Sequence, residues 1–177
     1  MKGRVKVAVA GALVAATALA GTAALAGGGG SISETLSGYE EDPLTLSTTG
    51  TGEFKASIRA KDQKIRYELS YSALEGTVTQ AHIHFGGRAQ SGGIVAFLCS
   101  NLGNGPVGTQ ACPAGPATIR GTIEPADVLG PAAQGIAPGE FGEFVDAIRG
   151  GVTYANVHST LYPGGEIRAQ LEEHHDD

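Results

Sequence analysis

Most of the chain alternates hydrophobic and polar residues with a period of two. In residues 64–74, KIRYELSYSAL, apolar side chains at every second position are separated by polar ones, and residues 52–60 show the same alternation. Because successive side chains of a strand point to opposite faces, this pattern predicts half-buried β-strands. Further strands are predicted at 32–38, 77–85, 93–99, 118–123, 152–161 and 165–172, with Gly- and Pro-rich turns between them.

One late segment has the periodicity of a helix instead. Apolar residues recur there at i, i+3, i+4 and i+7, namely Phe141, Phe144, Val145 and Ile148. This spacing gives a short helix one apolar stripe, and Gly150 is a suitable end for it. Seven to nine short strands with a single helix predict an all-β fold, an antiparallel Greek-key or immunoglobulin-like β-sandwich with one short helix near 140–149.

The first 26 residues have the composition of a secretory signal peptide. Lys2, Arg4 and Lys6 precede an apolar run of Ala, Val and Leu that closes with the pattern A-L-A at Ala26. The alternative is a membrane anchor, because the run is about long enough to span a bilayer. Small residues dominate the run and a cleavage pattern ends it, so we predict cleavage near Ala26.

The predicted division is a signal peptide at 1–26, a Gly linker at 27–30, one folded domain at 31–171 and a flexible acidic tail at 172–177. Cleavage removes three of the 12 Lys and Arg residues and none of the 18 Asp and Glu, which leaves 9 against 18 and a net charge of −9. A chain this acidic does not bind nucleic acid through its overall field. We expect a secreted, extracellular or cell-wall-associated protein with no nucleic-acid partner and no stable membrane anchor.

The two cysteines of the chain, Cys99 and Cys112, are predicted to form a disulfide. Thiols of exported proteins meet an oxidising environment, in which disulfides form and persist. The segment between the two residues, SNLGNGPVGTQA, is rich in turn-forming residues. In the chain-entropy account a loop of this size contributes about 3 kcal/mol. A reactive thiol pair or a metal site fits less well, since the spacing is not C-x-x-C and no histidine is near in sequence.

Two histidines flank one isoleucine in the segment QAHIHFGG. Side chains at i and i+2 of a strand share a face, so His82 and His84 lie opposite the apolar Ala81 and Ile83. The same rule places His158 on the non-core face of its own strand. If the last strands are neighbours, one polar face carries His82, His84, Asn156, His158, Glu166, Arg168 and Gln170.

This polar face has three interpretations. Three imidazoles on adjacent strands are a sensible site for copper or zinc, because imidazole is a ligand for both ions. Alternatively, the histidines form a hydrogen-bonded network with Asn156, Glu166 and Arg168 that fixes the strand register. A site for a non-metal ligand is the third interpretation. Glu166 and Arg168 alone are more typical of a solvated charge pair.

The segments AHIHFGG and YANVHSTLYPGGEIRAQL resemble the CHRD (chordin) domain, which is found in bacterial exported proteins and in animal chordin. The resemblance covers about residues 31–171. It implies an extracellular, immunoglobulin-like β-sandwich module with no established enzymatic activity. The chain departs from the family in two places: the segment before the valine-containing strand lacks its usual Pro, and the loop between the cysteines is an insertion.

HIHFGG is also similar to the His-x-His copper strand of Cu/Zn superoxide dismutase. The bridging histidine and the zinc ligands of that enzyme have no counterpart here, since no histidine lies between Phe85 and Arg120. No G-x-S-x-G or H-E-x-x-H motif is present either, and no residue is assigned a catalytic role. We therefore expect a non-enzymatic module that binds an extracellular protein or a cell-envelope component. The alternative is a Cu/Zn-binding protein or dismutase-like metalloenzyme.

Overall fold

The computed structural model describes residues 29–174. Its eight strands are β1 (Gly30–Ser37), β2 (Thr51–Arg59), β3 (Lys64–Ser72), β4 (Val78–Phe85), β5 (Gly93–Ser100), β6 (Ala117–Ile123), β7 (Thr153–Ser159) and β8 (Ile167–Leu171). One α-helix, α1 (Phe141–Arg149), lies between β6 and β7, and short 3-10 helices occupy Gly38–Glu40, Ala60–Asp62, Pro125–Asp127 and Ala132–Gln134. The predicted all-β class with one short helix is confirmed.

Alternating burial explains why these segments form strands. In β2, Phe54 and Ile58 are fully buried while their neighbours Lys55 and Ser57 are exposed. β3 repeats this alternation in register with β2. β2 and β3 thus place every second side chain in the core, and burial of these apolar side chains drives the strands together.

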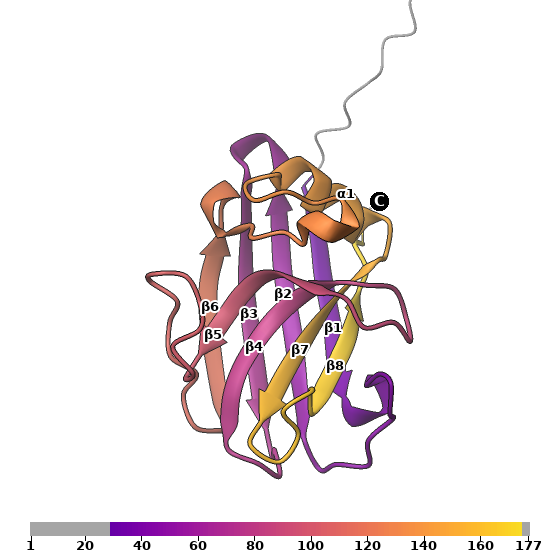
Figure 1. Ribbon diagram of the computed structural model, residues 1–177, viewed down its shortest axis with the longest axis vertical. Coiled ribbons are helices and arrows are strands. Elements are labelled where there is room, and N and C mark those ends of the chain that lie inside the picture. Colours follow the sequence, from indigo (N-terminus) through magenta and orange to yellow (C-terminus); the bar gives the residue numbers. More distant parts are fainter. Residues whose placement is uncertain (1–28, 175–177) are drawn as a thin grey trace, which may run out of the picture.

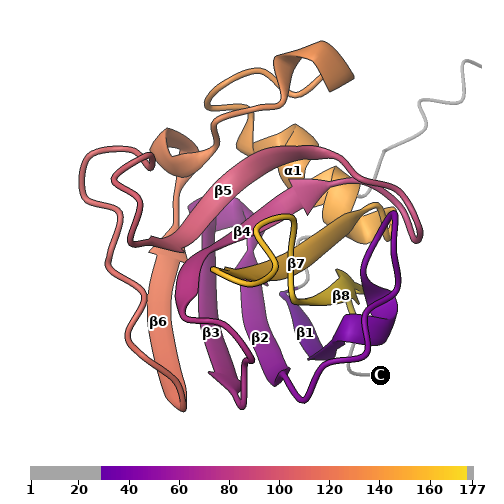
Figure 2. The same ribbon diagram turned by 60° about the horizontal axis from the view of Figure 1, so that its bottom comes forward.

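The strands form one antiparallel sheet in the order β5-β4-β7-β8-β1-β2-β3-β6. Figures 1 and 2 show the sheet curling, so that β5, β4 and β7 lie across β6, β3 and β2 and enclose the core between the two halves. The finer prediction of a Greek-key, immunoglobulin-like sandwich stays a prediction, because the hydrogen bonding joins all eight strands into a single sheet.

Helix α1 covers one end of this core (Figure 1). Its buried side chains are Phe141, Phe144, Val145, Ala147 and Ile148, which include the whole of the predicted apolar stripe. The helix ends at Gly150, whose backbone N–H donates to the carbonyl of Asp146 at 2.9 Å. The sequence periodicity therefore located both the helix and its end.

The edge strands β5 and β6 meet at a seam without strand pairing in the described part of the chain. One side chain bridges it: Gln110 donates from Nε2 to the backbone carbonyl of Leu98 on β5 at 3.0 Å and to that of Arg120 on β6 at 3.2 Å. Gln110 belongs to the loop closed by the Cys99–Cys112 disulfide, which is confirmed. The disulfide loop thus lies over the seam.

The predicted domain ends need two corrections. Gly30, assigned to a glycine linker, is the first residue of β1 and pairs with Ile58 of β2. The tail was expected to be flexible from residue 172, but His174 exchanges two backbone hydrogen bonds with Ser31, at 2.8 and 3.2 Å. The predicted signal peptide and residues 175–177 lie outside the described residues. No described helix has the length and apolar character needed to cross a membrane.

Candidate metal centre

The three histidines come from two neighbouring strands. β4 and β7 pair antiparallel, so that His82 lies opposite Asn156 and His84 lies opposite Tyr154. His158 follows Asn156 by two residues on β7 and therefore shares its face. This register brings the three imidazoles together on the outer face of the curled sheet, opposite the apolar side chains of the core.

The imidazoles converge closely enough to share one ion. One ring nitrogen of each histidine lies within 4.8 Å of the corresponding nitrogens of the other two. His82 Nδ1 and His158 Nε2 are 3.2 Å apart. The rings are also enclosed, since His82, His84 and His158 expose only 1%, 9% and 6% of their surfaces. The residues were predicted on a polar, non-core face, and the structure shows that this part of the face is covered.

Backbone carbonyls fix which nitrogen of two rings is free to bind a ligand. His84 Nδ1 lies 2.9 Å from the carbonyl of Gly92, and His158 Nδ1 lies 3.0 Å from the carbonyl of Pro163. A carbonyl only accepts hydrogen bonds, so both Nδ1 atoms carry the proton and both Nε2 atoms keep their lone pairs. This arrangement, in which one ring nitrogen donates to the protein and the other is free, is typical of metal-binding histidines.

His82 offers two nitrogens to the same space. Its Nδ1 faces His158 Nε2, while its Nε2 is buried without a partner among the described residues. His84 Nε2 is also buried and unpartnered. Buried polar atoms normally have a hydrogen-bond partner, so two orphaned ring nitrogens in one cluster point to a group that binds there.

Burial also sets the charge of the cluster. Burial, together with the two neighbouring imidazoles, lowers the pKa of His82 to about 2. Burial, with smaller contributions from His158 and Arg168 and against the hydrogen bond to Gly92, lowers the pKa of His84 to about 4. Burial lowers the pKa of His158 as well, against a hydrogen bond to Pro163 that raises it. All three rings are therefore neutral at pH 7, which is the form that coordinates a metal ion.

Aromatic and cationic groups surround the histidines. The ring of Tyr154 stacks on His84 with centroids 4.8 Å apart and planes 3° from parallel. The guanidinium carbon of Arg168 lies 3.5 Å from the centroid of the same Tyr154 ring. On the other side of the cluster, Phe97 of β5 contacts His82 edge to face, with centroids 4.4 Å apart.

The loop from Gly86 to Gly92 covers this layer and is fastened by side chains of β8. Arg168 Nη2 donates to the carbonyls of Gly87 and Gln90 at 2.8 and 3.2 Å. Gln170 Nε2 donates to the carbonyl of Gly86 at 2.9 Å. The backbone N–H of Gly92 in turn donates to the hydroxyl of Tyr154. The loop that supplies the carbonyl for His84 is thus held in place by four hydrogen bonds.

A buried carboxyl group lies beside the cluster. Asn156 donates from Nδ2 to Glu41 Oε1 at 2.8 Å. Burial raises the pKa of Glu41 to about 7, although the hydrogen bond from Asn156 and the charge of Arg168 act against this rise. Gly165 passes directly over the pair, and a Cβ atom there would lie 2.6 Å from both Asn156 Nδ2 and Glu41 Oε2.

The expected network between the histidines and Asn156, Glu166 and Arg168 is not found among the described residues. Each histidine bonds only to another histidine or to a backbone carbonyl. Glu166 and Arg168 are also not a solvated charge pair, because they expose 0% and 2% of their surfaces. The carboxylate of Glu166 instead accepts hydrogen bonds from Thr48 and from two backbone N–H groups.

Several contributors to the site were not assigned to it from the sequence. Tyr154 shares the alternation of Asn156 and His158, so strand parity could have included it. Glu41 lies in the acidic stretch YEEDP, which has the composition of an exposed loop. The carbonyls of Gly92 and Pro163 carry no sequence signal, since every residue has one.

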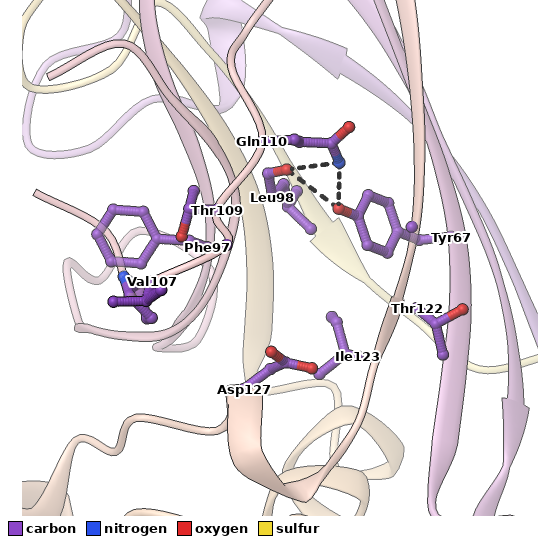
Figure 3. Close-up of a pocket in the computed structure, with 12 residues that line it drawn as sticks. Tyr67, Phe97, Leu98, Val107, Thr109, Gln110, Thr122, Ile123 and Asp127 are labelled. Carbon is purple, nitrogen blue, oxygen red and sulfur yellow. Dashed lines mark hydrogen bonds between the residues drawn. The ribbon is translucent and has the colours of Figure 1, made fainter. Parts of the chain in front are cut away.

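A separate pocket of about 390 Å³ opens at the seam between β5 and β6. Figure 3 shows Phe97, Val107 and Thr109 on one side and Thr122, Ile123 and Asp127 on the other, with Gln110 hydrogen-bonded to Tyr67 and Leu98 across one end. The carboxylate of Asp127 accepts a hydrogen bond from the backbone N–H of Glu124. The pocket contains no cluster of ligating groups among the described residues, so the histidine site is the stronger candidate.

The sequence model of the CHRD domain matches residues 32–171, which includes every strand except the first residues of β1. No curated protein and no solved structure matched the chain.

Proposed function

This chain belongs to the CHRD domain family, and we propose that it is an extracellular module that binds a transition-metal ion, copper or zinc, through His82, His84 and His158. The observation that carries the proposal is the convergence of three buried ring nitrogens within 4.8 Å of one another. A metal ion about 2.0–2.1 Å from each of three nitrogens holds them within about 4.2 Å of one another, so small movements of the rings would complete the site.

Two further observations support the metal over a purely structural cluster. The carbonyls of Gly92 and Pro163 orient His84 and His158 as metal ligands are oriented. Moreover, a structural cluster would be expected to satisfy its own polar atoms, whereas His82 Nε2 and His84 Nε2 have no partner among the described residues.

Titration with Cu(I), Cu(II) and Zn(II) tests the proposal. In a background carrying His174→Ala and His175→Ala, which removes the histidines near the C-terminus, the protein should bind at least one of these ions with a 1:1 stoichiometry. His82→Ala should weaken that binding by orders of magnitude, because a ligand is lost. Equal, weak binding in the two proteins would leave the histidines as part of the structure.

Because the three histidines are enclosed, we propose that the protein binds the ion without catalysing a reaction. A dismutase needs an open metal position that its substrate can reach, whereas His82 Nε2 and His84 Nε2 expose almost no surface. A dismutase assay on copper-loaded protein discriminates the two, and a rate above that of free copper would favour the metalloenzyme.

Export and a partner are the remaining parts of the proposal. A basic, apolar N-terminal segment, the Cys99–Cys112 disulfide and the family all support a secreted or cell-wall-associated protein. The family also favours a protein or cell-envelope partner. Immunoblotting of culture medium and cell-wall fractions tests the location, and the exported chain should begin near residue 27.

A further inference from the structure

The candidate ligand set carries no negative charge. Among the described residues, the group that can hold an ion consists of three histidines, without a carboxylate or a thiolate. Imidazole is a neutral ligand, so the full charge of a bound ion remains in the site. In surroundings with little water, each additional unit of unbalanced charge is costly.

A fixed positive charge lies close to the same cluster. The guanidinium of Arg168 covers one face of Tyr154, and His84 stacks on that ring. Arg168 is 2% exposed and donates to two neutral carbonyls, and it forms no salt bridge among the described residues. Its charge is therefore shielded little by solvent and acts on an ion held by the histidines.

The buried carboxyl group of Glu41 lies beside the cluster. This carboxyl group bonds to Asn156 rather than to Arg168. Because its pKa is raised to about 7, it carries only part of a negative charge at neutral pH. Glu41 therefore offsets the charge of Arg168 only in part.

Coordination number points in the same direction. Zn(II) sites are four-coordinate, and Cu(II) favours tetragonal geometry. Three nitrogens leave both ions short of ligands, and the layer above the histidines is closed by the loop from Gly86 to Gly92. Cu(I), a monovalent d¹⁰ ion, is satisfied by three ligands and carries half the charge of Zn(II) or Cu(II).

We propose that the site binds Cu(I) in preference to Cu(II) and Zn(II), and that Arg168 determines this preference through its charge. This inference rests on the proposed metal-binding function. It adds the oxidation state of the ion and a specificity-determining residue outside the ligand set.

The test compares the affinities for the three ions in the background that lacks His174 and His175. Cu(I) affinity is measured anaerobically with ascorbate by competition against bicinchoninate, and Cu(II) and Zn(II) affinities by calorimetry. We expect Cu(I) to bind at least about tenfold more tightly than Cu(II), which places the reduction potential of the bound copper about 59 mV or more above that of the aqueous ion.

Two substitutions at Arg168 separate charge from shape. Arg168→Gln should lower the ratio of Cu(I) to Cu(II) affinity about tenfold, whereas Arg168→Lys, which keeps the charge, should retain it. If Arg168→Gln does not fold, Glu41→Gln serves instead. It keeps an acceptor for Asn156, removes the opposing charge, and should raise the ratio.

The experiment distinguishes failure of the proposed Cu(I) preference from failure of the proposed metal binding. If no ion binds more tightly to the protein than to its His82→Ala variant, the metal-binding function is wrong. If Cu(II) or Zn(II) binds tightly and depends on His82 while Cu(I) binds no better, only the preference is overturned. An affinity ratio unchanged in both Arg168→Gln and Glu41→Gln would overturn the role of Arg168.

Discussion

Charged residues on the outer faces of the two halves of the sheet differ in their exposure to solvent. On β2, β3 and β6, Lys55, Glu68 and Arg120 lie side by side in register and remain in contact with solvent. On β7 and β8 every residue is buried, including Arg168, and so is Glu166 immediately before β8. The strands of both halves alternate apolar and polar side chains in the same way.

The difference comes from loops rather than from the strands. Loops from three parts of the chain cover the β4-β7-β8 half, contributing Glu41, the segment from Gly86 to Gly92, and Pro163. Alternation therefore predicts which side chains leave the core. Whether those side chains meet water depends on what lies above them.

We expect the largest difference in stability between alanine variants of two glutamates, Glu166 and Glu68. Glu166→Ala removes an acceptor from Thr48 and from the N–H groups of Glu75 and Gly76, at 2.8, 2.6 and 3.4 Å. Leaving three partly buried donors without partners should cost about 3 kcal/mol. Glu68→Ala on the open face should cost less than about 1 kcal/mol. Urea unfolding of the two variants measures both, and similar costs would refute the distinction between the faces.

Two adjacent glycines provide a second contrast. Gly165 has a φ of +138°, and a Cβ atom there would meet Asn156 and Glu41 at 2.6 Å, whereas a Cβ atom at Gly164 meets nothing within 4 Å. Gly165→Ala should therefore lower stability by about 2–3 kcal/mol. Gly164→Ala should leave the melting temperature almost unchanged. Equal melting temperatures would show that the covering loop adapts freely.

The covered half should also give the metal-free protein opposing pH dependences. The lowered pKa of His84 means that only the unfolded chain gains a proton as the pH falls from about 6.5 toward 4, so stability falls. The raised pKa of Glu41 means that the folded protein gains a proton first between about pH 7 and 4.5, so stability rises.

Glu41→Gln should expose the histidine contribution. At about 1.36 kcal/mol per pKa unit, the variant should lose roughly 1–3 kcal/mol relative to the parent protein as the pH falls from 7.5 to 5. Urea unfolding in the presence of a chelator, repeated across this range, measures the difference. Parallel curves would mean that Glu41 titrates in the folded protein as it does in water.

The smallest contrast concerns two tyrosines. Tyr154→Phe keeps the ring stacked on His84 but removes the acceptor of the Gly92 N–H group. This change should cost about 1 kcal/mol and leave the affinity for the ion nearly unchanged. Tyr39, which is 72% exposed, provides the control, and Tyr39→Phe should have no measurable effect on stability.

The sequence predicted the strands, the helix and the shared face of the histidines because each follows from a local period. Phe54 and Ile58, or His82 and His84, share a side whatever the rest of the chain does. The burial of that face depends on contacts between distant segments, such as Asn156 with Glu41, 115 residues apart. Register shifts within the pairing of β4 and β5 also adjust the spacing around His82 without a sequence signal.

The seam between β5 and β6 has a consequence for association between molecules. Unpaired strand edges are templates for intermolecular β-pairing, which leads to aggregation. Here Gln110 of the disulfide loop occupies one backbone carbonyl on each edge. Reduction of Cys99–Cys112 would release that loop and expose both edges at once. We therefore expect the disulfide to limit self-association, and reduction should increase the aggregation of the protein.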